Sequence, residues 1–283
     1  MESPQSTIKL NNGCRIPVLG FGTFLMPPGD MAYDSVRAAL DAGYRHIDTA
    51  SVYKNESDVG RAVRDSGIPR GEIFVTTKLW NDDQGYEPTL KAFQKSLEKL
   101  GLDYVDLYLI HWPRIKRAPD DWVRLDRETW DAMQQLYEDG MIKAIGVSNF
   151  KAHHLESLME MSDIKPMVNQ IELHPGLLQQ ETVDFCRKYD IAIEAWGPFS
   201  RGNLLKAGLL NDMAAKYGKT PAQICLRWHL ENGFIPLPKS VTPSRIVENT
   251  EIFDFSILAD DLALISEIDI DTGTGYDPDK VAW

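Results

Sequence analysis

The stretch Asp48-Thr-Ala-Ser-Val-Tyr53 begins inside an apolar run, residues 45–50, and leads into a helix that we expect to begin near Lys54. It places a carboxylate and a phenol together at the end of a predicted strand. The next apolar run ends in Lys78, and the run after it ends in His111. Four polar side chains at the ends of three successive strands predict a proton-transfer site built on a barrel.

Apolar runs alternate with segments of helical spacing along most of the chain. Leu90, Phe93, Leu97 and Leu100 recur at steps of three and four, and Gly101 follows where a helix C-cap glycine would stand. Strict alternation requires a parallel sheet with helices packed outside it. Eight such units in 283 residues favour an α/β fold of one (β/α)8 TIM barrel. The predicted strands are Leu19–Thr23, His46–Ala50, Ile73–Lys78, Val105–His111, Ala144–Ser148, Met167–Ile171, Ala192–Trp196 and Phe234–Pro238.

Three segments lie outside the repeat. Two short runs flanking Asn12-Gly13 predict an N-terminal β-hairpin, because this dipeptide favours a tight turn. Residues 258–268 predict an extra C-terminal helix, and residues 269–283 a loose tail rich in Gly and Asp. No linker or low-complexity stretch interrupts the chain, so we expect a single domain over residues 1–283.

Composition narrows the partners and the compartment. A net charge of -12 argues against nucleic acid or an anionic membrane as main partner, but not against a phosphorylated ligand held by a local basic cluster. No apolar run approaches the roughly 20 residues needed to cross a bilayer, and the N-terminus has no signal-peptide pattern. Cys14, Cys186 and Cys225 are far apart and lack metal-ligand spacing. We expect a cytoplasmic protein without an obligate protein partner.

With Asp48, Tyr53, Lys78 and His111 in this order, the chain closely resembles the aldo-keto reductase superfamily over nearly its whole length. It is similar to the small bacterial, protist and prostaglandin F synthase-like members. The resemblance implies reduction of aldehydes or ketones to alcohols by hydride transfer from the nicotinamide C4 of NADPH. The motifs that carry it are Gly20–Thr23, Gly43–Ala50, Leu109–Pro113, Gly146–Phe150, Asn169–Glu172 and Leu237–Ser240.

The resemblance assigns catalytic roles to the four polar residues. Tyr53 would be the general acid that protonates the carbonyl oxygen. A free phenol, with a pKa of about 10, holds its proton too tightly for best transfer, so the adjacent Lys78 ammonium would lower that pKa. Asp48 would pair with Lys78 and keep it charged. His111 would hydrogen-bond the carbonyl oxygen as a neutral imidazole.

No metal site is expected. His153 and His154 are neighbours on a predicted helix and would not share a face, which favours a solvated surface pair. The glycines of Gly20-Phe-Gly-Thr23 lack the third glycine of a Rossmann fingerprint and are discounted as a dinucleotide motif.

A better phosphate site is Ser240-Val-Thr-Pro-Ser-Arg245, which follows the eighth predicted strand and leads into a helix. By resemblance, Lys239 and Arg245 grip the 2′-phosphate that distinguishes NADPH from NADH, and Asn249 contacts adenine. Ser148, Asn149 and Gln170 would hold the nicotinamide carboxamide, and Trp196, where many relatives carry tyrosine, would stack on the ring. The further implied cofactor contacts are Gly22, Thr23, Asp48, Gly197, Pro198, Ser200, Ser240 and Val241.

The substrate pocket would have the apolar walls Phe24, Trp80 and Trp112, with Trp283 at the entrance and Tyr53 and His111 at the base. Short loops favour an open pocket for small aldehydes, dicarbonyls or flexible ketones. Two alternatives stay open. A non-catalytic NADPH-binding sensor subunit of the same fold would bind a partner protein without turning over. An aldolase-type barrel would use Lys78 as a Schiff-base nucleophile, although pairing with Asp48 argues for a permanently charged amine.

Overall fold

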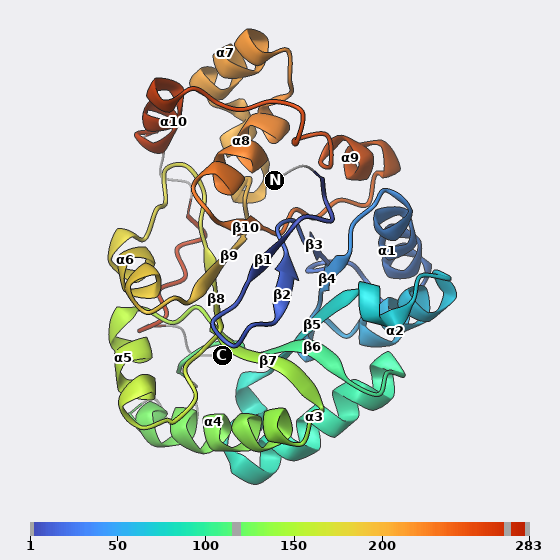
Figure 1. The fold of residues 1–283 in the computed structure, drawn as a ribbon, viewed down its shortest axis with the longest axis vertical. Helices are drawn as coiled ribbons and strands as arrows, with labels where there is room; N and C mark the ends of the chain where they lie inside the picture. Colours follow the sequence, from blue (N-terminus) through green and yellow to red (C-terminus); the bar gives the residue numbers. More distant parts are fainter. Residues whose placement is uncertain (1–2, 115–119, 269–272, 281–283) are drawn as a thin grey trace.

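The computed structural model describes residues 3–114, 120–268 and 273–280 (Figure 1). Eight parallel strands follow one another in chain order around a barrel. Backbone hydrogen bonds from Gly20 N to Pro236 O (3.1 Å) and from Gly22 N to Pro238 O (3.0 Å) join the first strand to the last and close it. The strands are β3 (Phe21–Gly22), β4 (His46–Asp48), β5 (Phe74–Leu79), β6 (Val105–Ile110), β7 (Ile142–Ser148), β8 (Val168–Glu172), β9 (Ala192–Trp196) and β10 (Ile235–Pro236). The predicted (β/α)8 barrel is confirmed.

Helices surround the barrel, as Figure 1 shows. In α3 the predicted stripe packs inward through Phe93, Leu97 and Leu100, which are buried. Gly101 ends this helix with a positive φ of 61° and donates its N–H to Leu97 O, as expected of a C-cap glycine. The helices are α1 (Asp30–Asp41), α2 (Glu56–Asp65), α3 (Tyr86–Leu100), α4 (Trp122–Glu138), α5 (Ala152–Glu160), α6 (Gln180–Lys188), α7 (Gly208–Tyr217), α8 (Pro221–Glu231), α9 (Pro243–Glu248) and α10 (Ala259–Ser266).

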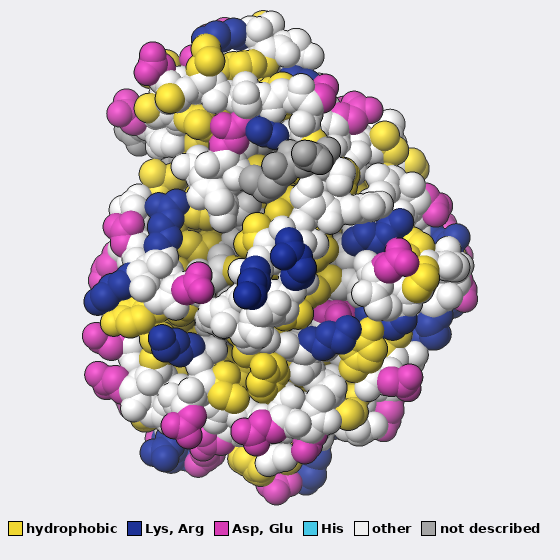
Figure 2. Space-filling view, in the orientation of Figure 1, with side chains coloured by type: hydrophobic (Ala, Val, Ile, Leu, Met, Phe, Trp, Pro, Cys, Tyr) yellow, Lys and Arg dark blue, Asp and Glu magenta, His cyan; other side chains and the backbone are white. Residues whose placement is uncertain are grey.

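The predicted N-terminal hairpin is present as β1 (Thr7–Lys9) paired antiparallel with β2 (Arg15–Pro17). Asn11 and Asn12 in its turn donate hydrogen bonds to the carbonyls of Pro166, Asp190 and Lys143, near the starts of β8, β9 and β7. The hairpin therefore covers the end of the barrel at which the strands begin and leaves the other end open for the site. Figure 2 shows acidic and basic side chains interspersed over the face that carries it.

The C-terminal segment agrees with the prediction in part. Helix α10 lies within the predicted residues 258–268, and residues 273–280 form neither helix nor strand. The expected looseness of this tail is wrong for its described part, because the Lys151 ammonium contacts carboxylates of both Asp277 and Asp279. Among the described residues, no helix has the length and apolar character needed to cross a membrane.

Candidate active site

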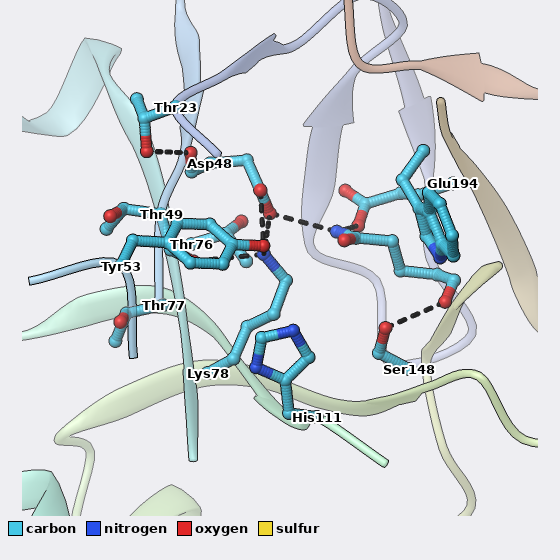
Figure 3. Close-up of polar contacts among 12 residues, drawn as sticks. Thr23, Asp48, Thr49, Tyr53, Thr76, Thr77, Lys78, His111, Ser148 and Glu194 are labelled. Atoms are coloured by element: carbon cyan, nitrogen blue, oxygen red, sulfur yellow. Dashed lines mark hydrogen bonds and ion pairs between the residues drawn. The ribbon is translucent and has the colours of Figure 1, made fainter. Parts of the chain in front are cut away.

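The ends of β4, β5 and β6 bring the four predicted polar residues together (Figure 3). The Lys78 ammonium lies 2.7 and 2.8 Å from the two carboxylate oxygens of Asp48 and 3.0 Å from Thr49 O. Its Nζ is also 3.4 Å from the Tyr53 hydroxyl. The His111 ring stands beside the Tyr53 ring, with centroids 5.8 Å apart. The Tyr53 phenol, the Lys78 ammonium and the His111 imidazole therefore lie close together at the open end of the barrel.

Tyr53 ends a single 3-10 turn, η1 (Ser51–Tyr53), whereas the following helix α2 begins only at Glu56. The predicted helix start near Lys54 was therefore slightly early. Lys54 has a positive φ of 62°, which ends the turn. Buried Asn55 accepts a hydrogen bond from the Thr49 hydroxyl (2.7 Å) and donates to two carbonyls of the loop after β3. These contacts fix the turn and hence the direction of the phenol.

The electrostatics partly differ from expectation. Burial by itself lowers the pKa of Lys78, but Asp48, Tyr53 and Glu194 together hold that pKa above its usual value. For Tyr53, burial raises the pKa above that of a free phenol, and Lys78 opposes the rise without reversing it. The expected net lowering of the Tyr53 pKa is therefore wrong for this structure. Burial, followed by the charge of Lys78, places the pKa of His111 well below its usual value, so its imidazole is neutral at neutral pH.

A second polar group faces the first across the barrel. Gln170 Nε2 donates to Asp48 Oδ2 at 2.9 Å, and the Ser148 hydroxyl donates to Gln170 O at 2.8 Å. Asn149 has a left-handed backbone with φ 64° and donates from Nδ2 to His111 O at 3.0 Å. The Trp196 indole donates to Asn149 Oδ1 at 2.8 Å, a hydrogen bond that a phenylalanine could not make. The ring predicted to stack on the cofactor is thereby held in place.

A cavity with a volume of about 1210 Å³ is lined by these groups. Among the predicted residues, those that line it are Gly22, Phe24, Asp48, Tyr53, Trp80, His111, Trp112, Ser148, Asn149, Gln170, Trp196, Gly197, Pro198, Lys239, Ser240, Arg245 and Asn249. Lys78 lies beneath its floor, fully buried, and Thr23 is buried with its hydroxyl donating to Asp48 O. Ser200 and Val241 adjoin lining residues without forming part of the wall. Trp283 lies outside the described residues.

Two cations, Lys239 and Arg245, also line the cavity. Both are exposed, and within the described part of the chain neither side chain forms an ion pair or a hydrogen bond. The Ser240 hydroxyl accepts a hydrogen bond from Thr242 N at 3.1 Å and shapes the turn between them. A cavity of this size, lined by a polar group, an aromatic ring and two exposed cations, fits a dinucleotide with a phosphate.

Two groups were missed from the sequence. Tyr276, in the tail, lines the cavity and packs edge-on against Trp112 with ring centroids 6.4 Å apart. Glu194 is fully buried beneath the site and accepts a hydrogen bond from Gln170 Nε2 at 2.7 Å. The period of a strand held a signal for Glu194, because it lies two residues before Trp196 on the same face of β9. Tyr276 had no comparable local signal.

The interpretation of His153 and His154 as a solvated pair is wrong. His154 is fully buried, and both Nε2 atoms approach Asp279 Oδ1, at 3.0 Å from His153 and 3.1 Å from His154. The Lys151 backbone N–H donates to His154 Nδ1, so the neutral ring carries its proton on Nε2, the atom that lies 3.1 Å from Asp279 Oδ1. A metal ligand would need a lone pair at that nitrogen. His153 and His154 therefore help to hold the C-terminal tail against helix α5 through Asp279. The Lys151 ammonium forms an ion pair with the other carboxylate oxygen of Asp279.

Comparisons with known proteins agree with this geometry. A model of the Aldo/keto reductase family matches residues 18–270. The chain is 48% identical over 281 residues to the glyoxal reductase of Bacillus subtilis (strain 168), covering 99% of both chains. It is 46% identical over 284 residues to the 9,11-endoperoxide prostaglandin H2 reductase of Trypanosoma cruzi (strain CL Brener), covering 99% of this chain and 97% of that one. It matches the crystal structure of a Gox0644 variant in complex with NADPH with a TM-score of 0.91, 42% identity and 99% coverage of both chains. The chain therefore belongs to the aldo/keto reductase family and is an NADP-dependent oxidoreductase.

Proposed function

We propose that this protein reduces small aldehydes and ketones to alcohols, with NADPH as the hydride donor and Tyr53 as the general acid. The observation that carries the proposal is the contact of the Tyr53 hydroxyl with the Lys78 ammonium, which is itself paired with Asp48. This arrangement lies at the base of a cavity large enough for a dinucleotide and a small carbonyl compound together. Bound NADPH would supply a hydride to the carbonyl carbon.

The residues of the chain hold the two reactants in different ways. Lys239 and Arg245 would bind the 2′-phosphate, because both cations are exposed and line the cavity. Gln170 and Trp196 would hold the nicotinamide. Gly22 lines the cavity, and it lets the end of the last strand approach closely, since a Cβ there would lie 3.3 Å from Leu237 O.

Proton transfer follows from the protonation states at the base of the cavity. Tyr53 keeps its proton at neutral pH, because its pKa is raised by burial, and therefore has a proton to donate. The neutral His111 donates a hydrogen bond to the carbonyl oxygen and adds no positive charge that would compete with Lys78. As hydride arrives at carbon, the oxygen becomes negative and takes the phenolic proton.

The walls support a small, uncharged substrate. Phe24, Trp80 and Trp112 line the cavity beside the Tyr53 hydroxyl, and Phe24 is half exposed at the rim. Because one relative is named glyoxal reductase, we expect dicarbonyls to be the preferred class among the small substrates. We also propose a cytoplasmic location, since all three cysteines are free thiols, as expected in a reducing compartment.

The proposal is tested by mixing the purified chain with NADPH and a panel of aldehydes, α-dicarbonyls, sugars, steroids and prostanoids. The loss of absorbance of the reduced nicotinamide measures turnover. We expect the highest kcat/KM with a small aldehyde or dicarbonyl. Binding of NADPH without oxidation against any activated aromatic aldehyde would contradict the proposal and favour a sensor subunit of the same fold.

A further inference from the structure

Glu194 is a buried carboxyl group that the proposed chemistry does not use. It lies on β9, directly beside Gln170 in the strand register, and its side chain is inaccessible to solvent (Figure 3). Its Oε2 accepts a hydrogen bond from Gln170 Nε2 at 2.7 Å, and its Oε1 lies 3.4 Å from His46 Nε2. Gly20 leaves the space for His46, because a Cβ at Gly20 would lie 2.7 Å from His46 Nδ1.

Both hydrogens of the Gln170 amide nitrogen are committed. One is donated to Glu194 and the other to Asp48 Oδ2, at 2.9 Å. Because Asp48 is the carboxylate of an ion pair with Lys78, it accepts hydrogen bonds and donates none. Turning the amide over would place its oxygen against that carboxylate. The two carboxyl groups therefore fix the nitrogen of Gln170 toward the barrel interior and its Oε1 away from them.

We propose that Glu194 is a positioning residue that orients the Gln170 carboxamide, so that Gln170 offers the nicotinamide carboxamide a hydrogen-bond acceptor and no donor. The inference rests on the proposed function, in which Gln170 contacts the nicotinamide. Under this arrangement, the amide group of the cofactor donates an N–H to Gln170 Oε1. Glu194 itself touches neither cofactor nor substrate.

The arrangement holds for both protonation states of Glu194. Burial and the neighbouring Asp48 raise the pKa of Glu194 to about 8. Since Oε2 faces an N–H donor, a proton on the neutral carboxyl resides on Oε1, which faces His46 Nε2. Burial lowers the pKa of His46 to about 3, so that ring stays neutral and contacts the Thr76 hydroxyl at 3.0 Å. Oε2 accepts from Gln170 in either state.

The test uses the reduced 3-acetylpyridine analogue of NADPH, in which a methyl ketone replaces the carboxamide and no N–H remains to donate. Fluorescence titration of the unaltered chain should give a Kd for the analogue roughly fivefold above that for NADPH, the effect of one ordinary hydrogen bond. In Glu194→Met, which keeps the side-chain length but removes the acceptor, this ratio should fall to near one. Glu194→Gln is the matched control. It can turn its oxygen to Gln170 and its nitrogen to His46, so the ratio should stay near the unaltered value.

Three results would overturn the inference: a ratio near one in the unaltered chain, an unchanged ratio in Glu194→Met, or a loss in Glu194→Gln as large as in Glu194→Met. The last would mean that charge, and not acceptance of a hydrogen bond, is what matters. The ratio of the two Kd values in the unaltered chain needs no substitution, so it tests the inference even if Glu194→Met fails to fold. Absence of NADPH binding by the unaltered chain would overturn the proposed function as well, whereas an unchanged ratio in Glu194→Met leaves that function intact.

Discussion

Replacing Tyr53 with phenylalanine removes the proposed acid and little else. The hydroxyl contacts Lys78 Nζ at 3.4 Å, a long hydrogen bond, while Lys78 keeps its shorter contacts to Asp48. We therefore expect a change in the free energy of unfolding of about 1 kcal/mol or less. Loss of a general acid costs at least about 100-fold in turnover, which corresponds to a barrier higher by about 2.7 kcal/mol. Stability and rate should thus separate clearly.

Three measurements separate these effects: kcat with a small aldehyde, the Kd of NADPH by fluorescence titration, and the melting temperature. We expect a large loss in kcat alone. Tyr44→Phe is the matched control, because the Tyr44 hydroxyl is buried and has no hydrogen-bond partner in the described part of the chain. That variant should keep all three values. A kcat for Tyr53→Phe within about threefold of the unaltered enzyme would remove Tyr53 from the mechanism.

Three further predictions concern the cofactor and pH. Lys239→Ala or Arg245→Ala should raise the Kd of NADPH at least about tenfold and that of NADH little, and equal losses in parallel titrations would refute a phosphate contact. Trp196→Phe removes the 2.8 Å hydrogen bond to Asn149 and should raise the Kd of NADPH roughly fivefold. An unchanged Kd would show that this hydrogen bond does not hold the ring for cofactor binding. Burial lowers the pKa of His46 from 6.5 to about 3, so its neutral form stabilises the fold above the unfolded pKa, and this stability is lost as pH falls through that range. His46→Gln should reduce the loss of unfolding free energy between pH 6.5 and 3 by up to about 1.4 kcal/mol per pH unit, measured by urea unfolding. The same dependence of unfolding free energy on pH in both proteins would contradict this prediction.

The alternation of apolar runs was enough to predict the barrel, because buried parallel strands need continuous apolar residues and each crossover needs a helix. Ends were less accurate. The predicted strands 19–23 and 234–238 shorten to two residues each, and the backbone of Gly20 and Pro238 closes the barrel instead. Such closure bonds join segments more than 200 residues apart and leave no local pattern.

The proposed catalytic group was predictable because Asp48, Lys78 and His111 lie at or next to the ends of strands, and parallel strands present their ends at one mouth. The contacts that hold the C-terminal tail were not predictable from the sequence. Asp279 meets His154 across 125 residues of sequence, and helical spacing describes only contacts within one helix. The same limit applies to Tyr276, whose contact with Trp112 depends on the path of the tail.

The raised pKa of Tyr53 is compatible with a catalytic role for Lys78. In the resting site, Lys78 and Asp48 form a neutral pair, so burial decides the pKa of the phenol. In the proposed proton transfer a negative charge would form on the phenolic oxygen, 3.4 Å from the ammonium. At an effective dielectric constant of roughly 20, that attraction is about 5 kcal/mol, partly offset by repulsion from Asp48. Because the charge would exist only as the proton leaves, Lys78 would stabilise the transition state more than the resting enzyme, which is the condition for raising kcat.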